Sequence, residues 1–108
     1  MSINPAVLQP GIVLTTAAAV VVLSALNTRS IIKRAVAANT TAGAITITVY
    51  RLPFGGTALL IVPPRSIAAN GTDLLPELTT MVLYAGDGIT ALASAATSLN
   101  FFASGYTA

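Results

Sequence analysis

The segment Ala44–Arg51 alternates strictly between aliphatic side chains and polar or aromatic ones. Ile45, Ile47 and Val49 would lie on one face of an extended chain, with the intervening residues on the other face. This period of two predicts a half-buried β-strand, because an amphipathic helix needs apolar residues three and four positions apart.

Turn-forming residues interrupt the rest of the chain at short intervals. The clearest are Pro53-Phe54-Gly55-Gly56, Pro63-Pro64, Asn70-Gly71, Pro76 and Gly86-Asp87-Gly88. Asn70-Gly71 is typical of a type I′ turn, because Asn and Gly tolerate positive φ. Short runs between regular turns, in a chain of 108 residues, predict one all-β domain: an antiparallel β-sandwich, or a jelly-roll-like fold.

The predicted strands include two stretches whose composition would also permit a helix. Those stretches are residues 15–26 and 90–98, and both lack an acidic first turn. The other predicted strands are residues 30–39, 44–51, 57–62, 65–69, 78–84 and 98–103. A polar loop, Asn39–Gly43, separates the strands 30–39 and 44–51 and predicts that these two form a hairpin.

Residues 1–11 contain two prolines and no charge, which predicts an extended N-terminal arm ahead of a sandwich domain over residues 12–108. Such a segment is either a disordered leader or an arm along a neighbouring subunit or a capsid. Its apolar composition favours the arm, with Ile3, Val7 and Leu8 buried in the contact.

Charged residues are scarce, at 7% against about 25% in an average soluble domain. Five lysines and arginines and three acids cannot cover the surface of a solitary monomer, so we expect the chain to bury much of its surface in lipid or against other subunits. Histidine and cysteine are absent, which removes the commonest general base and two common metal ligands. We therefore expect no enzyme activity, no metal site and no cofactor.

The three acids have ordinary structural interpretations. Asp87 lies between two glycines and is interpreted as a turn residue that bonds nearby backbone, because a calcium loop needs several acids at fixed spacing. Asp73 and Glu77 could resemble a glycosidase pair, but no aromatic platform lies near them in the sequence. Salt bridges to Arg65 across an interface, or loop charges, are the favoured interpretation.

Arg29, Lys33 and Arg34 are the one cluster of basic residues. On a regular strand Arg29 and Lys33 would share one face and Arg34 would take the other, which divides the cluster. A nucleic-acid partner is therefore not expected, because groove binders carry a continuous basic stripe.

The apolar run Gly11–Leu26 keeps a membrane protein open as an alternative. It has 16 residues, whereas a spanning helix needs about 20, or about 17 at the short end. Its valines and threonines also favour strands, so a protein without a membrane anchor is the preferred interpretation.

Four aromatic residues are candidate contacts with other subunits or a shell. Phe54 sits in a turn, where it is either an exposed contact or part of the core. Phe101 and Phe102 are consecutive, so one should meet the core and the other a neighbour, and Tyr106 follows on the same run.

The order of these segments resembles a group of small β-sandwich virion proteins of tailed bacteriophages, over residues 12–106. The segments that carry the resemblance are Leu14–Leu23, Ser30–Thr41, Ala44–Tyr50, Ile67–Leu75, Met81–Ser94 and Phe102–Tyr106. They include the Asn39-Thr-Thr loop and the Leu83-Tyr-Ala-Gly-Asp-Gly-Ile-Thr-Ala91 corner. The aromatic-proline turn usual between the first strands is replaced by Leu23–Thr28.

The resemblance implies a structural role in a virion. Proteins of this kind decorate or cement capsids, or form neck, collar and tail parts, commonly as trimers or higher homo-oligomers. The resemblance therefore implies a homo-oligomer, with a trimer favoured, that contacts the major capsid protein or other virion proteins. A sugar-binding module for host attachment is a further alternative, for which the chain offers few aromatic platforms.

Overall fold

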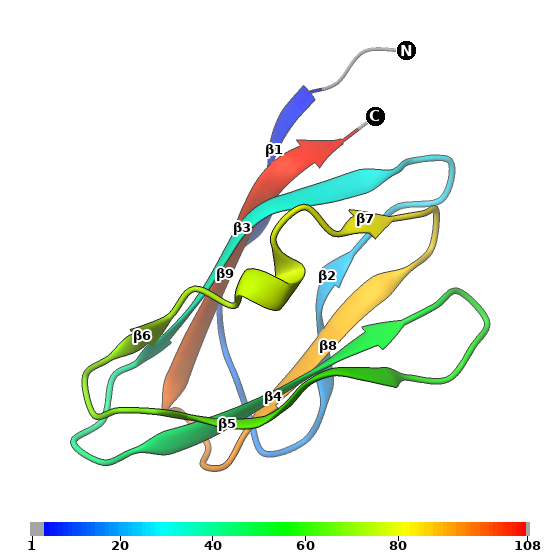
Figure 1. Ribbon diagram of the computed structural model, residues 1–108. Coiled ribbons are helices and arrows are strands. Elements are labelled where there is room, and N and C mark those ends of the chain that lie inside the picture. The colour runs from blue at the N-terminus through cyan, green and yellow to red at the C-terminus, as the bar shows by residue number, and fades with distance from the viewer. Residues whose placement is uncertain (1–3, 108) are drawn as a thin grey trace.

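The computed structural model describes residues 4–107, which form two β-sheets packed face to face (Figure 1). The strands are β1 (Asn4–Val13), β2 (Ala19–Leu23), β3 (Ser30–Asn39), β4 (Ile45–Leu52), β5 (Leu59–Ile67), β6 (Thr72–Asp73), β7 (Val82–Leu83), β8 (Gly88–Ala93) and β9 (Leu99–Thr107). A single 3₁₀ turn, η1 (Pro76–Leu78), lies between β6 and β7.

The strand order is that of a jelly roll. Sheet A has the order β1-β9-β3-β6, with β7 also paired to β3, and sheet B has the order β2-β8-β4-β5. Every pairing is antiparallel, and most consecutive strands lie in opposite sheets. Both sheets therefore depend on pairings between distant parts of the chain, and the predicted antiparallel sandwich of the jelly-roll kind is confirmed.

The predicted hairpin of residues 30–39 and 44–51 is wrong, because β3 belongs to sheet A and β4 to sheet B. The side chain of Asn39 holds the corner between them. Its amide nitrogen donates to the carbonyls of Gly43 at 2.8 Å and Ile67 at 3.0 Å, and its oxygen accepts from the Thr41 N–H at 2.9 Å. These bonds satisfy the loop backbone and direct the chain across the sandwich.

The predicted boundary between an arm and a domain falls inside β1. This strand pairs with β9 from Asn4 opposite Thr107 to Val13 opposite Asn100, with two register shifts on the way. The described part of the predicted arm is thus extended as expected, but it is the edge strand of sheet A.

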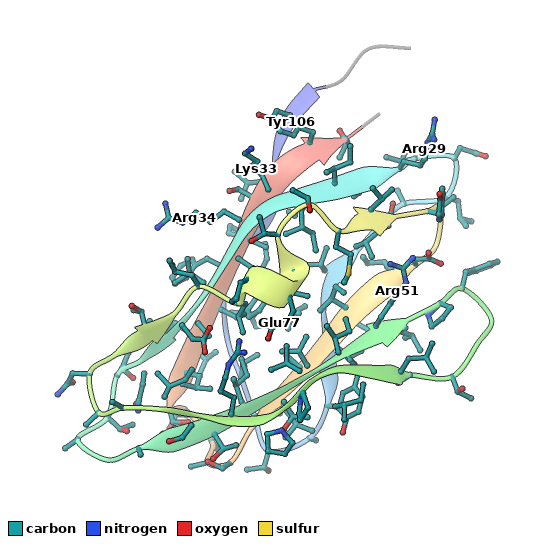
Figure 2. All side chains as sticks on the ribbon, in the orientation of Figure 1. Arg29, Lys33, Arg34, Arg51, Glu77 and Tyr106 are labelled. Atoms are coloured by element: carbon teal, nitrogen blue, oxygen red, sulfur yellow. The ribbon has the colours of Figure 1, made fainter. Side chains whose placement is uncertain are left out.

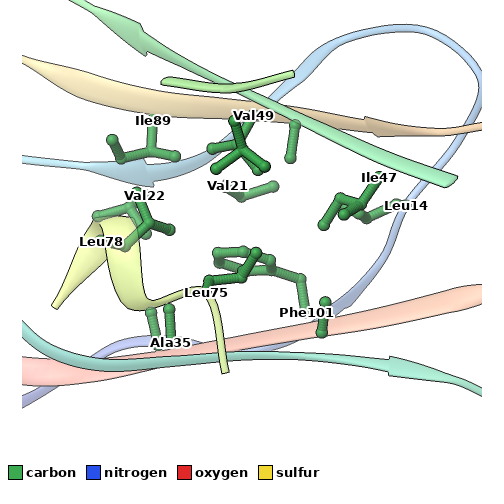
Figure 3. Packing of buried hydrophobic residues seen from close by; sticks show 14 of the residues in the cluster. Leu14, Val21, Val22, Ala35, Ile47, Val49, Leu75, Leu78, Ile89 and Phe101 are labelled. Atoms are coloured by element: carbon green, nitrogen blue, oxygen red, sulfur yellow. The ribbon is translucent and has the colours of Figure 1, made fainter. Parts of the chain in front are cut away.

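The core lies between the sheets and is filled by one side of each long strand (Figure 3). Phe101 of β9 is fully buried, and Ile47 and Val49 of β4 face it from sheet B, as their alternation predicts. Leu75, just before η1, and Leu78, its last residue, are buried and close the core between β6 and β7.

Other predicted elements are partly right. The stretches 15–26 and 90–98 supply β2 and β8, and no helix within residues 4–107 is long and apolar enough to cross a membrane. Residues 57–62 and 65–69 merge into the single strand β5, whose register shifts around its two prolines. The predicted strand 78–84 keeps only β7, because Leu75 and Thr80 adopt positive φ and bend the chain around η1.

Candidate interaction surfaces

The edges of both sheets are poorly suited to adding another strand. The long edge strands carry proline pairs, Pro5 and Pro10 on β1 and Pro63 and Pro64 on β5. At the opposite edges, β2 has 5 residues and β6 and β7 have 2 each. Prolines and short strands prevent edge-to-edge pairing, so any association of this chain falls to its sheet faces and loops.

The outer face of sheet B carries only uncharged side chains. One row crosses all four strands, and its members are Val20, Thr90, Tyr50 and Leu60. Neighbouring rows add Leu23, Leu52, Leu92, Thr48, Thr46 and Ser66. We call these ten residues the sheet B outer face; Leu23 and Leu60 on it are 65% and 53% exposed.

Within the sheet B outer face, the Thr90 hydroxyl is buried without a hydrogen-bond partner. Apolar neighbours in the same row surround it, namely Val20 and the ring of Tyr50. This part of the surface therefore behaves more like the inside of an interface than like a hydrated sheet.

The outer face of sheet A is built differently. On it Val7, Ser104 and Arg34 form one row across β1, β9 and β3, and Phe102 and Tyr106 of β9 lie on either side of Ser104. We call these five residues, together with Lys33, the sheet A outer face.

The ring of Phe102 lies over Gly11 of β1, where a Cβ would stand 2.9 Å from the ring atom Cε2. Phe102 is 42% exposed and borders a shallow hollow of about 170 Å³. The hollow is lined by Val7, Gln9, Pro10, Arg34, Phe102, Ala103 and Ser104. An apolar floor with a guanidinium at its rim is thus open to solvent on this face.

A β-bulge brings Lys33 and Arg34 to the solvent together. The register of β3 against β9 shifts between Ile32 and Arg34, so both basic residues are exposed (Figure 2). Gly105 on β9 makes room for the bulge, since a Cβ there would overlap the Ile31 carbonyl oxygen. The prediction that strand alternation separates Lys33 from Arg34 is wrong, because it assumed a regular strand.

All three acids of the chain are engaged by arginines within the same molecule. Arg51 contacts Asp87 at 2.8 Å, and Arg65 contacts Asp73 at 2.7 Å and Glu77 at 2.6 Å. The predicted partnership of Arg65 with these acids is confirmed, but it lies within one chain, where it joins β5 of sheet B to β6 and η1 on the side of sheet A. The hydrogen bond to Glu77 raises the pKa of Arg65, and the hydrogen bond from Arg65 lowers the pKa of Glu77.

Asp87 is the most buried of the three acids and organises one end of the sandwich. Its carboxylate accepts the N–H of Phe54 at 2.9 Å and of Tyr84 at 3.2 Å, besides the bond from Arg51. These bonds, from Phe54 first, hold the pKa of Asp87 below its ordinary value although burial opposes them. The interpretation of Asp87 as a turn residue is confirmed, and it links the β4–β5 turn to β8 as well.

The predicted contact residues divide into exposed and buried ones. Val7 and Phe54 are exposed at 69% and 68%, and Phe102 points outward, whereas Tyr106 is half-buried. Phe101 is wholly in the core, so it is not free to meet a neighbour, and Leu8 is partly buried against the core. Ile3 lies outside the described residues. Of the consecutive pair, Phe101 lies in the core and Phe102 faces solvent, and the contact of Phe102 with a neighbour stays a prediction.

The sequence matches no known family, and a search of curated proteins finds no significant match. Among solved structures, a chain in the structure of infectious bursal disease virus, Gx strain, is similar, with a TM-score of 0.50 and 14% identity. The match covers 98% of this chain and 31% of that one, so this chain spans about a third of that protein's length. The crystal structure of the same virus's VP2 subviral particle gives a TM-score of 0.41, with 15% identity over 98% of this chain and 31% of that one. The first likeness supports the jelly-roll fold.

Proposed function

We propose that this protein is a non-enzymatic structural component of a virion that assembles as a homo-oligomer. Three observations support a virion role: the jelly-roll order, which viral shell proteins share with lectins and cupins, the similar fold in infectious bursal disease virus, and the resemblance to phage virion proteins. The finer form of the proposal is a bacteriophage protein that decorates or cements the capsid, or forms part of the neck or tail.

The observation that carries the proposal is the uncharged sheet B outer face. It includes the exposed leucines at positions 23 and 60, and each of its ten side chains is neutral. The molecule measures 45 × 27 × 19 Å, so a broad face offers more than the about 800 Å² per partner that a stable interface buries. Self-association through this face would remove the apolar surface for which the chain has too few charges.

An oligomer formed in this way should be nearly insensitive to salt. Uncharged surfaces bind through apolar burial, which moderate concentrations of sodium chloride hardly change. Sedimentation equilibrium of the purified chain at low and high salt tests this, and we expect one oligomer with dissociation constants that agree within about twofold. A monomer at all concentrations would refute the homo-oligomer.

The virion part of the proposal has its own test. Particles of the virus or phage that encodes this chain should retain it through density-gradient purification, in a fixed ratio to the major capsid protein. Labelled antibody and electron microscopy would then locate it on the shell, neck or tail. A protein found only in the soluble lysate would refute the virion role.

A further inference from the structure

We propose that the sheet A outer face docks an acidic segment of another protein, with a carboxylate on Arg34 and an apolar side chain in the hollow beside Phe102. The inference rests on the proposed virion role, where it gives the chemistry of the shell or neck surface to which this subunit attaches. It adds a heterologous contact to the self-association through sheet B.

The first support is where the unpaired charge lies. Lys33 and Arg34 are exposed and make no ion pair within the described part of the chain, whereas all three acids are engaged by Arg51 and Arg65. β3 therefore carries two positive charges that form no ion pair within residues 4–107. A surface with free guanidinium and ammonium groups is complementary to carboxylates.

The second support is the shape beside these charges. Arg34 lines the same hollow as Val7, Pro10 and Phe102, so one ligand can contact cation and apolar floor together. Gly11 leaves the space that the Phe102 ring occupies beside β1. An aromatic anchor next to an arginine is the usual composition of an energetically important patch in a protein interface.

A second copy of this chain does not fit this face. Its three carboxylates are already held by arginines, so two sheet A outer faces in contact would oppose Lys33 and Arg34 to their own equivalents. Like charges across an interface disfavour association. A partner with free carboxylates meets no such repulsion.

Nucleic acid fits less well than protein. Single-strand binders use a positively charged groove that follows the phosphates, and here two cations stand beside one short hollow. Two phosphate contacts would give only weak, strongly salt-dependent binding. The apolar lining is better matched by an amino-acid side chain than by a ribose-phosphate backbone.

The test uses the full chain and three labelled probes at low salt: a copolymer of glutamate and tyrosine, polyglutamate, and a thymidine oligonucleotide. We expect the copolymer to bind most tightly, because it supplies both carboxylates and apolar side chains. Arg34→Gln should weaken its binding about three- to fivefold, and Phe102→Ala by a similar factor. Arg29→Gln is the matched control, since it removes one positive charge away from the hollow and should change binding less than about twofold.

Three results would overturn the inference. They are no binding of the copolymer, equal weakening by Arg29→Gln and Arg34→Gln, and tighter binding of the oligonucleotide with the same dependence on Arg34. Thermal unfolding of each variant checks that the fold is intact, and Arg34→Gln keeps the test valid if Phe102→Ala unfolds. Sedimentation of the same samples separates the two proposals, because an unsubstituted chain that forms oligomers but does not bind the copolymer refutes only the sheet A contact.

Discussion

The two outer faces of the sandwich differ in charge far more than in secondary structure. Both sheets are antiparallel, yet the sheet B outer face is neutral throughout and the sheet A outer face presents Lys33 and Arg34 beside Phe102. A charge-poor chain has therefore not diluted its charges evenly. It has left one face suited to copies of itself and another suited to a different partner.

The positions of the three acids explain why the two outer faces differ in charge. Asp73 and Glu77 with Arg65 join β6 and η1, on the side of sheet A, to β5 of sheet B. Asp87 pairs with Arg51 of β4, which also donates to the Val82 carbonyl of β7. No carboxylate is then left to neutralise either outer face. Because the acids pair with Arg51 and Arg65, no acid lies beside Lys33 and Arg34, and the charges of the sheet A outer face are all positive.

The largest effect should come from removing the bulge that exposes both cations. Gly105→Ala places a Cβ against the Ile31 carbonyl oxygen, a backbone atom that cannot move without breaking the β3–β9 ladder. We expect a loss of at least about 3 kcal/mol in the free energy of unfolding, measured with urea. Gly43→Ala is the control, because nothing lies within 4 Å of its Cβ position. A cost below about 1 kcal/mol for Gly105→Ala would contradict this account of the bulge.

A positive charge placed on the sheet B outer face should weaken self-association of the chain. Leu60→Lys puts an ammonium group into the proposed self-association surface, where it would be desolvated without a partner. We expect a cost of about 3 kcal/mol, which weakens association about 100-fold in sedimentation equilibrium. Val7→Lys, on the sheet A outer face, where Val7 is 69% exposed against 53% for Leu60, should leave the dissociation constant unchanged. Equal weakening by both substitutions would argue against a distinct sheet B interface.

Removing an acid should cost more where the acid is buried. Asp87→Ala loses bonds to Arg51 and to the N–H groups of Phe54 and Tyr84, and we expect it to lower the free energy of unfolding by about 2 kcal/mol. Glu77→Ala, whose side chain is 36% exposed, should cost less than about 1 kcal/mol. The pair is compared by chemical denaturation at neutral pH, and the reverse order would show that the Arg65 cluster dominates.

Low pH should reduce the stability of the fold, because protonation of Asp87 and Glu77 breaks their ion pairs with Arg51 and Arg65. The pKa values of Asp87 and Glu77 are lowered by folding, so the unfolded chain binds protons more readily than the folded one. Their contribution is complete above the ordinary carboxyl pKa of about 4 and is lost as the pH falls below it. Melting temperatures should be flat from pH 7 to about pH 5 and then decline. A chain equally stable at pH 2 would show that these pairs contribute nothing.

Local signals in the sequence predicted much of this fold and less of its surfaces. The alternation of Ile45, Ile47 and Val49 identified β4 and its buried face, and adjacent Phe101 and Phe102 divided between core and solvent as expected. Those features depend only on the period of an extended chain.

The rest depends on partners that are distant in the sequence. A polar loop after Asn39 suits a hairpin or a corner equally, and only pairing with β9 and β5 places β3 and β4 in opposite sheets. The bulge at Lys33 exists because Gly105 lies opposite it, which no local pattern in β3 reveals. Residues 4–11 likewise become part of the sandwich only because β9 pairs with them.

The most direct test of the two-face account is a labelling rate measured on each face. The chain has no cysteine, so Leu60→Cys and Ser104→Cys each introduce one thiol, on the sheet B and sheet A outer faces. Both thiols should react with a maleimide at similar rates in dilute protein. On concentration, we predict that the thiol at position 60 becomes at least about tenfold slower as the oligomer forms, while the thiol at position 104 keeps its rate. Protection at position 104 alone, or at neither position, would contradict the account.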